Sequence, residues 1–209
     1  MIFNIAAVVI GYLLGSIPSA YIVARLTKKI DIRQVGSGNV GALNVYREVG
    51  PIFGLAVLAA DLAKGVLAVF IARWLGLSLV WTCVAGFAAV VGHNWPVFLG
   101  FKGGRGAVTI MGVFIPLIPV QFAIGFGIAA IVIIITSNVR LGIIGIACIP
   151  LIAWLFDKPA LLVFYSLALF LFLAIRSLTG IKGELARAGG KKSLIFDRDY
   201  HFWQTKKTK

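Results

Sequence analysis

The sequence contains few charged residues. Of its 209 residues, only 13% are Asp, Glu, Lys or Arg, whereas 60% are hydrophobic. A soluble domain typically has about 25% charged residues, and its core could not enclose apolar runs such as residues 5–14, 84–92 and 126–135. The shortage of charge therefore excludes an ordinary soluble domain and predicts an integral membrane protein.

Acidic residues are the scarcer of the two charge types. The chain has 7 Asp and Glu against 20 Lys and Arg, which gives a net charge of +13. In a soluble protein such an excess suggests nucleic acid binding, but basic residues beside membrane spans are also what the positive-inside rule predicts. Because the sequence lacks the interleaved aromatic and basic residues of single-strand binders, we expect no nucleic acid partner and favour anionic membrane lipids or phosphate compounds.

Cysteine and histidine are also scarce. The two cysteines, Cys83 and Cys148, lie in separate apolar runs without the spacing of metal ligands. We therefore expect small buried side chains rather than a disulfide or a ligand pair. The two histidines, His93 and His201, belong to no cluster of carboxylates or other imidazoles. The sequence predicts neither a metal site nor a cofactor.

Long apolar runs are what the sequence has in abundance. A helix needs about 20 apolar residues to cross about 30 Å of hydrocarbon, and the first run has neither the basic start nor the short length of a signal peptide. Pro116 and Pro119 divide a stretch that would be too long for one straight span. The sequence predicts seven membrane helices, at Ile2–Leu26, Ile52–Trp74, Leu77–Leu99, Ala107–Pro119, Val120–Ile135, Leu141–Phe156 and Ala160–Ile175.

Positive charge sets the predicted orientation. Basic residues are expected on the cytoplasmic side, and with seven spans the loops 28–47 and 102–105 fall on the same side as the tail 176–209. The prediction is a single all-α, membrane-embedded domain over residues 1–209, with its N-terminus outside and its basic tail in the cytoplasm. The basic residues of that tail are Arg176, Lys182, Arg187, Lys191, Lys192, Arg198, Lys206, Lys207 and Lys209.

The loop after the first span carries the sequence VGSGNVGALN at Val35–Asn44, which has the form G-x-G-x-x-G. A dinucleotide-binding turn of that form requires a βαβ unit around it, whereas here a membrane span and the basic connector KKIDIRQ precede it. We expect instead a glycine-rich nest for an anion; a flexible cytoplasmic loop of turn-forming residues is the alternative. The candidate substrate-binding residues are Ser37, Gly38, Asn39, Gly41, Asn44 and Arg47.

A second glycine-rich loop, GHNWPVFLGFKGGRGAVT at Gly92–Thr109, precedes a predicted helix start at Ala107. Glycine-rich backbone, cations and a helix N-terminus are the components of a phosphate site, although the Gly-Lys-Ser/Thr order of a Walker A loop is absent. Because both loops fall on one side of the membrane in the seven-span prediction, we expect them to form one site for phosphate compounds. The candidates are Lys102 and Arg105 as catalytic cations, with Gly103, Gly104 and Gly106 as binding residues.

Three polar residues lie within or at the end of predicted spans. His93 is near the end of the third span, and is either a general base or a structural hydrogen-bonding residue between helices. Asp61 and Lys64 lie about midway in the second span and are three residues apart, so they share a helix face and can pair. Because a charge at the bilayer centre costs about 2.5–3.5 kcal/mol, the pair should face the bundle interior, where a structural and a site-facing role are both open.

Four stretches together resemble one family. GSIPSAYIVARL at Gly15–Leu26, GSGNVGALNVYR at Gly36–Arg47, DLAKG at Asp61–Gly65 and the second glycine-rich loop are similar, in this order, to the bacterial PlsY family of acyl-phosphate:glycerol-3-phosphate acyltransferases. The resemblance implies seven spans in the bacterial inner membrane and an active site that faces the cytoplasm. It also implies acyl transfer from acyl phosphate to the sn-1 hydroxyl of glycerol 3-phosphate, which yields lysophosphatidic acid and phosphate for phospholipid synthesis without a cofactor.

The chain departs from the third motif of that family, which has the form His-x-x-Asn-Ile. Ser177 stands where the histidine is expected and Gly180 where the asparagine is expected, so no third-motif role is carried over. Under this hypothesis the first loop binds one phosphate, and the second loop binds the other and stabilises developing charge. The proton acceptor is either His93 or a phosphate oxygen of the substrate. A transporter of a small organic phosphate and a non-catalytic relative that binds lipid phosphate are the alternative functions.

Overall fold

The computed structural model describes residues 1–136 and 138–188, and every regular element in those ranges is a helix. The all-α class is therefore confirmed. The part of the predicted tail beyond residue 188 lies outside the described residues. The elements are α1 (Ile2–Ser16), α2 (Ser19–Lys28), α3 (Ala42–Glu48), α4 (Pro51–Trp74), α5 (Leu79–Asn94), η1 (Val97–Leu99), α6 (Ala107–Leu117), α7 (Pro119–Thr136), η2 (Val139–Gly142), α8 (Ile143–Leu155) and α9 (Ala160–Ala188).

The helices form two compact units. The first unit comprises Met1–Pro119, which contains α1 to α6, together with Leu171–Ser177 of α9. The second unit contains α7 from Val120 onward, the whole of α8, and the other parts of α9. All the candidate binding and catalytic residues, from Ser37 to Gly106, lie in the first unit. The assignment of residues 1–209 to a single domain stays a prediction.

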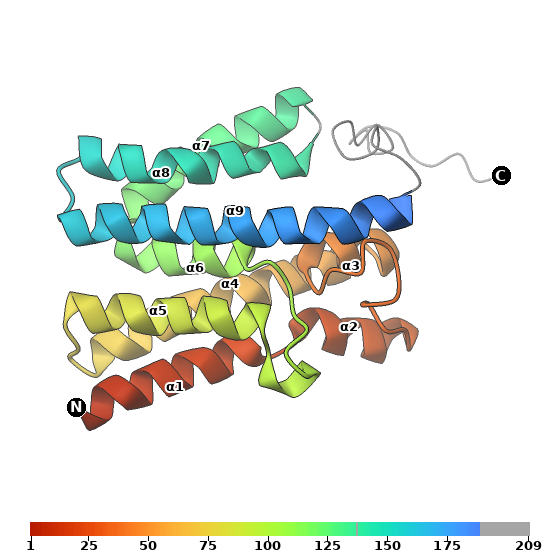
Figure 1. The fold of residues 1–209 in the computed structure, drawn as a ribbon, viewed down its shortest axis with the longest axis horizontal. Helices are drawn as coiled ribbons and strands as arrows, with labels where there is room; N and C mark the ends of the chain where they lie inside the picture. The colour runs from red at the N-terminus through yellow and green to blue at the C-terminus, as the bar shows by residue number, and fades with distance from the viewer. Residues whose placement is uncertain (137, 189–209) are drawn as a thin grey trace. The chain divides into compact units, whose positions relative to one another are not determined.

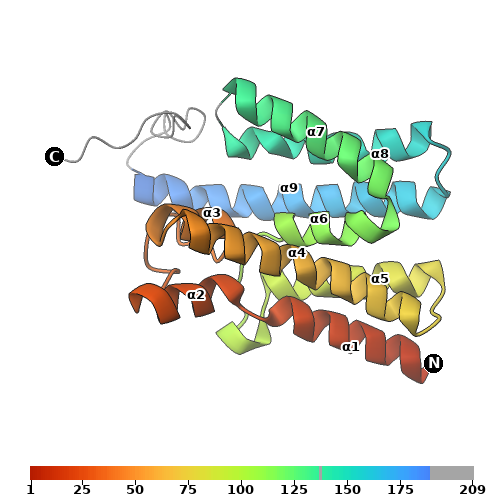
Figure 2. The ribbon, with the colours of Figure 1, turned by 180° about the vertical axis from the view of Figure 1, so that it is seen from behind.

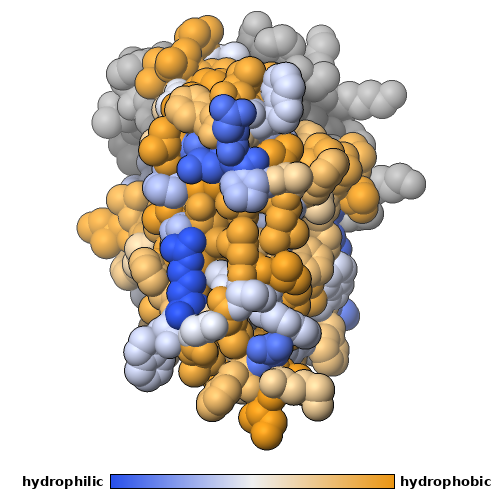
Figure 3. Space-filling model, turned by 90° about the vertical axis from the view of Figure 1, so that its left-hand side faces the viewer, coloured by the Kyte–Doolittle hydropathy of each residue, from blue (hydrophilic) through white to orange (hydrophobic). Residues whose placement is uncertain are grey.

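Apolar helices dominate the described chain. Two shorter apolar helices, α6 and α8, correspond to two of the seven predicted spans, and the face shown in Figure 3 is largely covered by hydrophobic side chains. The number of membrane crossings and their orientation stay predictions. In the part of the chain that the structure describes, five segments are long and apolar enough to cross a membrane: Ile2–Lys28, Pro51–Trp74, Leu79–Leu99, Pro119–Thr136 and Ala160–Leu178.

The first and last predicted spans differ from the helices observed. The first is two helices, α1 and α2, because Pro18 restricts the residue before it to an extended conformation; Ile17 has φ −60° and ψ 114°. The last helix continues to Ala188, beyond the predicted end at Ile175. The added segment is rich in Ala, Leu, Lys, Arg and Glu, which all favour helix.

Small residues let α1 and α5 approach closely in the first unit, where the two helices lie side by side (Figure 1). Gly11 and Gly15 of α1 face Ala85 and Ala89 of α5, and a Cβ on either glycine would collide with the carbonyl oxygen of the facing alanine. Both pairs are spaced four residues apart, which is the pattern that suits close helix packing in membranes.

Helices α4 and α6 make a second close pair in this unit (Figure 2). A Cβ at Gly65 would lie 2.7 Å from the backbone nitrogen of Val113 and 2.9 Å from the carbonyl carbon of Gly112. Because Asp61 and Lys64 lie within the turn before Gly65, this contact also fixes where the two charged side chains are placed within the unit.

The second unit packs in the same way. A Cβ at Gly125 of α7 would lie 2.6 Å from Cγ1 of Ile149 in α8, and a Cβ at Gly145 of α8 would lie 2.6 Å from the Cβ of Ala129 in α7. The glycines therefore determine the register of two helices whose other residues are mostly large and apolar.

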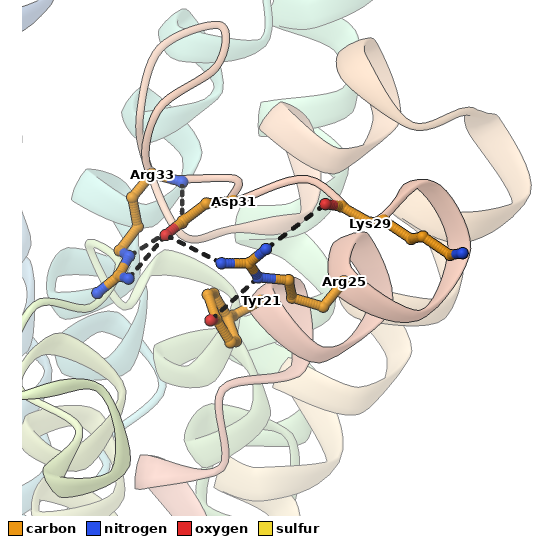
Figure 4. A network of polar contacts seen from close by, with 5 residues as sticks. All are labelled: Tyr21, Arg25, Lys29, Asp31 and Arg33. Carbon is orange, nitrogen blue, oxygen red and sulfur yellow. Dashed lines mark hydrogen bonds and ion pairs between the residues drawn. The ribbon is translucent and has the colours of Figure 1, made fainter.

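A polar network holds the connector between α2 and the first glycine-rich loop (Figure 4). Arg33 donates from Nε and Nη2 to the two carboxylate oxygens of Asp31 at 3.0 and 2.7 Å. Arg25 Nη2 lies 3.9 Å from Asp31 Oδ2, and both guanidinium groups lie over the ring of Tyr21, at 5.3 and 5.2 Å from its centroid. The hydrogen bond from the Arg33 side chain lowers the pKa of Asp31 from 3.8 to about 2, although burial of the carboxylate opposes the shift.

Replacing Gly65 with Ala is expected to destabilise the protein by about 1–3 kcal/mol, because the added methyl group overpacks the contact between α4 and α6. The measurement is the free energy of unfolding in detergent. Gly127→Ala is the matched control, since a Cβ at that helical glycine meets nothing within 4 Å, and it should stabilise the protein by up to about 1 kcal/mol. Equal stability of the two variants would contradict the close approach.

The Asp31–Arg33 pair makes stability depend on pH. A carboxyl whose pKa is lowered by folding stabilises the fold above its unfolded value of 3.8, and that contribution is lost as the pH falls from about 4 to about 2. Asp31→Asn should cost about 1 kcal/mol at pH 7, a modest value because the Arg33 side chain is 34% exposed. The difference in the free energy of unfolding between wild type and Asp31→Asn should disappear as the pH falls to about 2. A difference that stays constant with pH would contradict this role of Asp31. Asp157→Asn, at an exposed position, is the control.

Candidate functional site

The first glycine-rich loop is folded around the side chain of Asn44. The Oδ1 atom of Asn44 accepts a hydrogen bond from the backbone N–H of Ser37 at 3.0 Å. The Nδ2 atom donates to the backbone carbonyl oxygens of Ile32, Val35 and Asn39 at 3.1, 3.2 and 3.1 Å. Because Asn44 is only 3% exposed, its amide group organises the loop from inside.

The outer edge of this loop is open to solvent. Gly36 and Gly38 adopt φ values of 56° and 71°, which glycine tolerates without strain, and Gly36 is exposed. Among the predicted binding residues, Gly41 and Asn44 are buried, whereas those that are partly exposed are Ser37, Gly38, Asn39 and Arg47.

The second glycine-rich loop folds back onto the end of α5. The N–H groups of Gly103 and Gly104 donate to the carbonyl oxygens of Asn94 and His93, both at 3.1 Å. A Cβ on Gly103 would collide with the His93 carbonyl oxygen, and one on Gly104 with the Nε2 atom of His93. Glycine is therefore needed at both positions for the loop to approach the end of α5, and both N–H groups already donate hydrogen bonds to backbone carbonyl oxygens.

The two cations of this loop differ in exposure. Lys102 is exposed and makes no hydrogen bond or ion pair with the described part of the chain, whereas Arg105 is partly buried. Gly106, at φ 86°, immediately precedes α6, so that helix begins two residues after Arg105 and five residues after Lys102. The loop thus combines two positive side chains with the positive end of a helix dipole.

The two glycine-rich loops meet. The carbonyl oxygen of Val40 lies against Gly104, where a Cβ would be 2.7 Å away. Both loops also line one small pocket, to which the first contributes Val40 and the second Gly103. The pocket wall further includes three polar side chains from α2, α4 and α5, namely Ser19, Lys64 and His93. The predicted convergence of the two loops is therefore present in the structure.

A buried polar network lies at this pocket. Asp61 Oδ1 accepts hydrogen bonds from Lys64 Nζ at 2.7 Å and from the hydroxyl of Ser19. Lys64 Nζ also lies 3.2 Å from Ser19 Oγ, and His93 Nδ1 lies 3.7 Å from Asp61 Oδ1. The sequence predicted that Asp61 and Lys64 pair, but gave no signal that Ser19 and His93 join them. Within the described residues, no group of three or more His, Cys, Asp or Glu side chains could hold a metal ion.

Arg176 is a residue at this site that the sequence did not indicate, because its place after the last apolar run predicts only a basic residue of the tail. From α9 it donates through Nε to Asn94 Oδ1 at 3.2 Å and through Nη2 to the Gly104 carbonyl oxygen at 3.3 Å. Its guanidinium lies 4.7 Å from the ring centroid of Trp95. Arg176 therefore links α9 to the second loop. The sequence feature that could have indicated this role is an arginine directly after a long apolar run. Its neighbour Ser177 is partly buried in the same helix.

Known proteins of one family are similar to this chain over nearly its whole length. The profile of the glycerol-3-phosphate acyltransferase family matches residues 5–186. Glycerol-3-phosphate acyltransferase 1 of Dehalococcoides mccartyi is 40% identical, over 91% of this chain and 95% of its own. Glycerol-3-phosphate acyltransferase of Endomicrobium trichonymphae is 38% identical, over 91% of this chain and 96% of its own.

The fold also matches a solved structure. The glycerol 3-phosphate form of PlsY, an integral membrane glycerol 3-phosphate acyltransferase, superposes with a TM-score of 0.81 at 30% identity, over 95% of this chain and 99% of that protein. Its lysophosphatidic acid form superposes with a TM-score of 0.77 at 30% identity, over 89% and 92% of the two chains. The five long apolar segments found within the described residues agree with an integral membrane protein. By sequence profile, whole-length similarity and fold, the chain belongs to the glycerol-3-phosphate acyltransferase family.

Proposed function

We propose that this protein transfers an acyl group from acyl phosphate to the sn-1 hydroxyl of glycerol 3-phosphate, releasing lysophosphatidic acid and phosphate. The observation that carries the proposal is the meeting of the two glycine-rich loops at one pocket, with Lys102 and Arg105 on the second loop. The forms of the similar PlsY structure support it, because glycerol 3-phosphate and lysophosphatidic acid are an acyl acceptor and its acylated product.

Side chains, rather than the glycine N–H groups, are assigned to bind the phosphates. The N–H groups of Gly103 and Gly104 already donate to backbone carbonyls, so the second loop offers Lys102, Arg105 and the first turn of α6. The first loop offers Ser37, Asn39 and the guanidinium of Arg47, whose planar fork suits a phosphate. Asn44, Gly103 and Gly104 shape the two loops instead of touching the substrate.

The reaction needs charge stabilisation more than acid catalysis. The acceptor hydroxyl oxygen attacks the acyl carbonyl carbon, a new C–O ester bond forms, the bond from that carbon to the phosphate oxygen breaks, and phosphate leaves with the electron pair. Lys102 and Arg105 are assigned to stabilise negative charge on the carbonyl oxygen and the departing phosphate. His93 is assigned to accept the proton of the hydroxyl, because it lines the pocket between the loops.

The membrane placement follows from charge. We propose seven spans in a bacterial inner membrane, with the N-terminus outside and the two glycine-rich loops at the cytoplasmic surface, where basic residues concentrate. Such a site lies between water, which supplies glycerol 3-phosphate, and the apolar helices, which accommodate an acyl chain.

Replacing Lys102 with Ala should lower acyl transfer at least about 100-fold, because it removes a cation that stabilises developing charge. Purified protein in detergent is given acyl phosphate and glycerol 3-phosphate, and both released phosphate and acylated product are measured. Arg73→Ala is the control, since Arg73 is an exposed basic residue at the end of α4 away from the loops, and it should turn over like wild type.

The same assay decides between the candidate functions. Acylated product from the wild type supports the transferase. Glycerol 3-phosphate flux into liposomes without product would indicate a transporter, and binding without flux or product would indicate a non-catalytic relative. Wild-type turnover in a folded Lys102→Ala variant would refute the role of Lys102.

Cysteine labelling tests the predicted sidedness. Single Asn39→Cys, Lys102→Cys and Arg73→Cys variants are made after Cys83 and Cys148, which are both free thiols, have been replaced by Ala. An impermeant maleimide should label the first two only after the inner membrane is opened, and the third in intact spheroplasts. Helix α4 spans about 36 Å at ~1.5 Å per residue, enough to separate the two sides. Labelling of Asn39→Cys and Lys102→Cys from opposite sides would contradict a shared site.

A further inference from the structure

The helix α9 carries one charged residue inside its apolar part. Arg176 is the only charged residue in Ala160–Leu178, a segment long and apolar enough to cross a membrane. Charged side chains in such segments are costly and commonly mark functional sites. Arg176 belongs with Leu171–Ser177 to the first compact unit, which also contains both glycine-rich loops, and it is partly buried. Its charge therefore calls for an account that goes beyond the positive tail.

The guanidinium of Arg176 bonds two groups at once. Its Nε donates to Asn94 Oδ1 at 3.2 Å, and its Nη2 donates to the Gly104 carbonyl oxygen at 3.3 Å. The same group lies over the ring of Trp95, 4.7 Å from the centroid, so an aromatic ring and two oxygen acceptors fix its orientation. A planar fork with donors at fixed angles can make this set of contacts, whereas the single ammonium of a lysine cannot.

Asn94 connects Arg176 to two further glycines of the second loop. Asn94 is fully buried, and its Nδ2 donates to the Val90 carbonyl oxygen at 2.9 Å. Its main-chain carbonyl oxygen accepts the N–H of Gly103 at 3.1 Å, and a Cβ at Gly106 would lie 2.7 Å from its Nδ2. The amide of Asn94 cannot turn over without placing its NH2 group against the guanidinium, so Arg176 also fixes this side chain.

The bond to Gly104 fixes the peptide that leads into Arg105. Because a peptide unit is planar, directing the Gly104 carbonyl oxygen towards Arg176 also sets the direction of the Arg105 N–H and the place of the Arg105 Cα. The N–H of Gly104 is bonded to the His93 carbonyl oxygen. Glycine has wide conformational freedom, so bonds from both its N–H and its carbonyl oxygen are what hold this residue in one conformation.

We propose that Arg176 is a positioning residue for acyl transfer, which orients the second glycine-rich loop so that Lys102 and Arg105 face the reacting phosphate groups. It contacts the main chain of the loop and does not touch the substrate. The inference rests on the proposed transferase activity, in which those two cations stabilise developing charge. A misplacement of catalytic groups by 1 Å can cost about 100-fold in rate, so the loss of these two hydrogen bonds should lower kcat.

Two other accounts of Arg176 make different predictions. If it acts only through its charge, by attracting anionic substrates, Arg176→Lys should behave like wild type and the neutral Arg176→Met should raise KM with little change in kcat. If it only fastens α9 to the first unit, its variants should lose stability, but folded protein should keep the wild-type kcat. A positioning role predicts a lower kcat in folded protein even where the positive charge is kept.

The test compares Arg176→Lys and Arg176→Met with wild type, each purified in detergent, with kcat and KM measured for acyl phosphate and glycerol 3-phosphate. Arg176→Met is expected to lower kcat about 10–100-fold. Arg176→Lys should lower it about 3–10-fold, because lysine keeps the charge but not the forked pair of hydrogen bonds. KM should change less than about threefold in both. Wild-type kcat in either variant, or a loss confined to KM, would overturn the proposal, while wild-type turnover still supports the transferase.

Hydrogen exchange gives a readout that does not depend on activity. The N–H groups of Gly103 and Gly104 are bonded to carbonyl oxygens at the end of α5, and such bonds protect amides from exchange. In Arg176→Met, peptides that cover residues 101–106 should exchange at least about tenfold faster than in wild type, whereas peptides from α1 should be unchanged. Unchanged exchange in residues 101–106 would overturn the inference, whether or not the wild type transfers an acyl group.

Phe172→Leu is the matched control, one helical turn before Arg176. Phe172 packs edge-on against Trp95 and Phe87, with ring centroids 5.9 and 5.4 Å apart, and neither contact involves the segment 103–106. Losing these aromatic contacts should lower the Tm in detergent by about 2–4 °C and leave kcat within about twofold of wild type. A loss of kcat as large as that in Arg176→Met would show that packing of α9 sets the rate, and would overturn the role of the guanidinium.

Discussion

Two backbone hydrogen bonds determine where the second glycine-rich loop lies. Gly103 and Gly104 donate to the carbonyl oxygens of Asn94 and His93, and this is possible because neither glycine carries a Cβ. The contact brings the loop against Val40 of the first loop and over the network of Asp61 and Lys64. The position of the loop, and with it the pocket wall that Gly103 forms, therefore follows from one close approach between main chains. Arg176 strengthens it by bonding the Gly104 carbonyl oxygen from another helix.

The sequence predicted those parts of the structure that depend on composition and spacing. Low charge and long apolar runs indicated an all-helical membrane chain, Pro116 and Pro119 indicated the division between α6 and α7, and the three-residue spacing of Asp61 and Lys64 indicated their pairing. These features follow from short-range rules, in which a proline or a shared helix face decides the outcome. The convergence of the two loops was predicted from their common side of the membrane, without any knowledge of which atoms meet.

The remaining parts of the site depend on contacts between distant segments. Asn44 has the donors of a phosphate ligand, yet its amide group is occupied inside its own loop, and only the folded loop reveals this. Glycine spacing likewise does not distinguish N–H groups that bind an anion from N–H groups that bind a carbonyl. Arg176 is 72 residues from Gly104, so its charge alone suggested a tail residue. The sequence predicted one span over Ile2–Leu26 because the residues around Pro18 are apolar, whereas the structure has two helices that meet at Ile17 and Pro18.

The break at Ile17 and Pro18 separates two tasks along the first apolar stretch. Helix α1 is seated by Gly11 and Gly15 against α5, whereas α2 is seated by Ser19 at the buried carboxylate and by Ala20 and Ala24 in the core beside the first loop. The two-residue break allows α1 and α2 to pack independently against different partners. Substitutions on the exposed face of α1 can therefore accumulate without shifting Ser19, so that this face can vary while the polar network beside the pocket keeps its geometry.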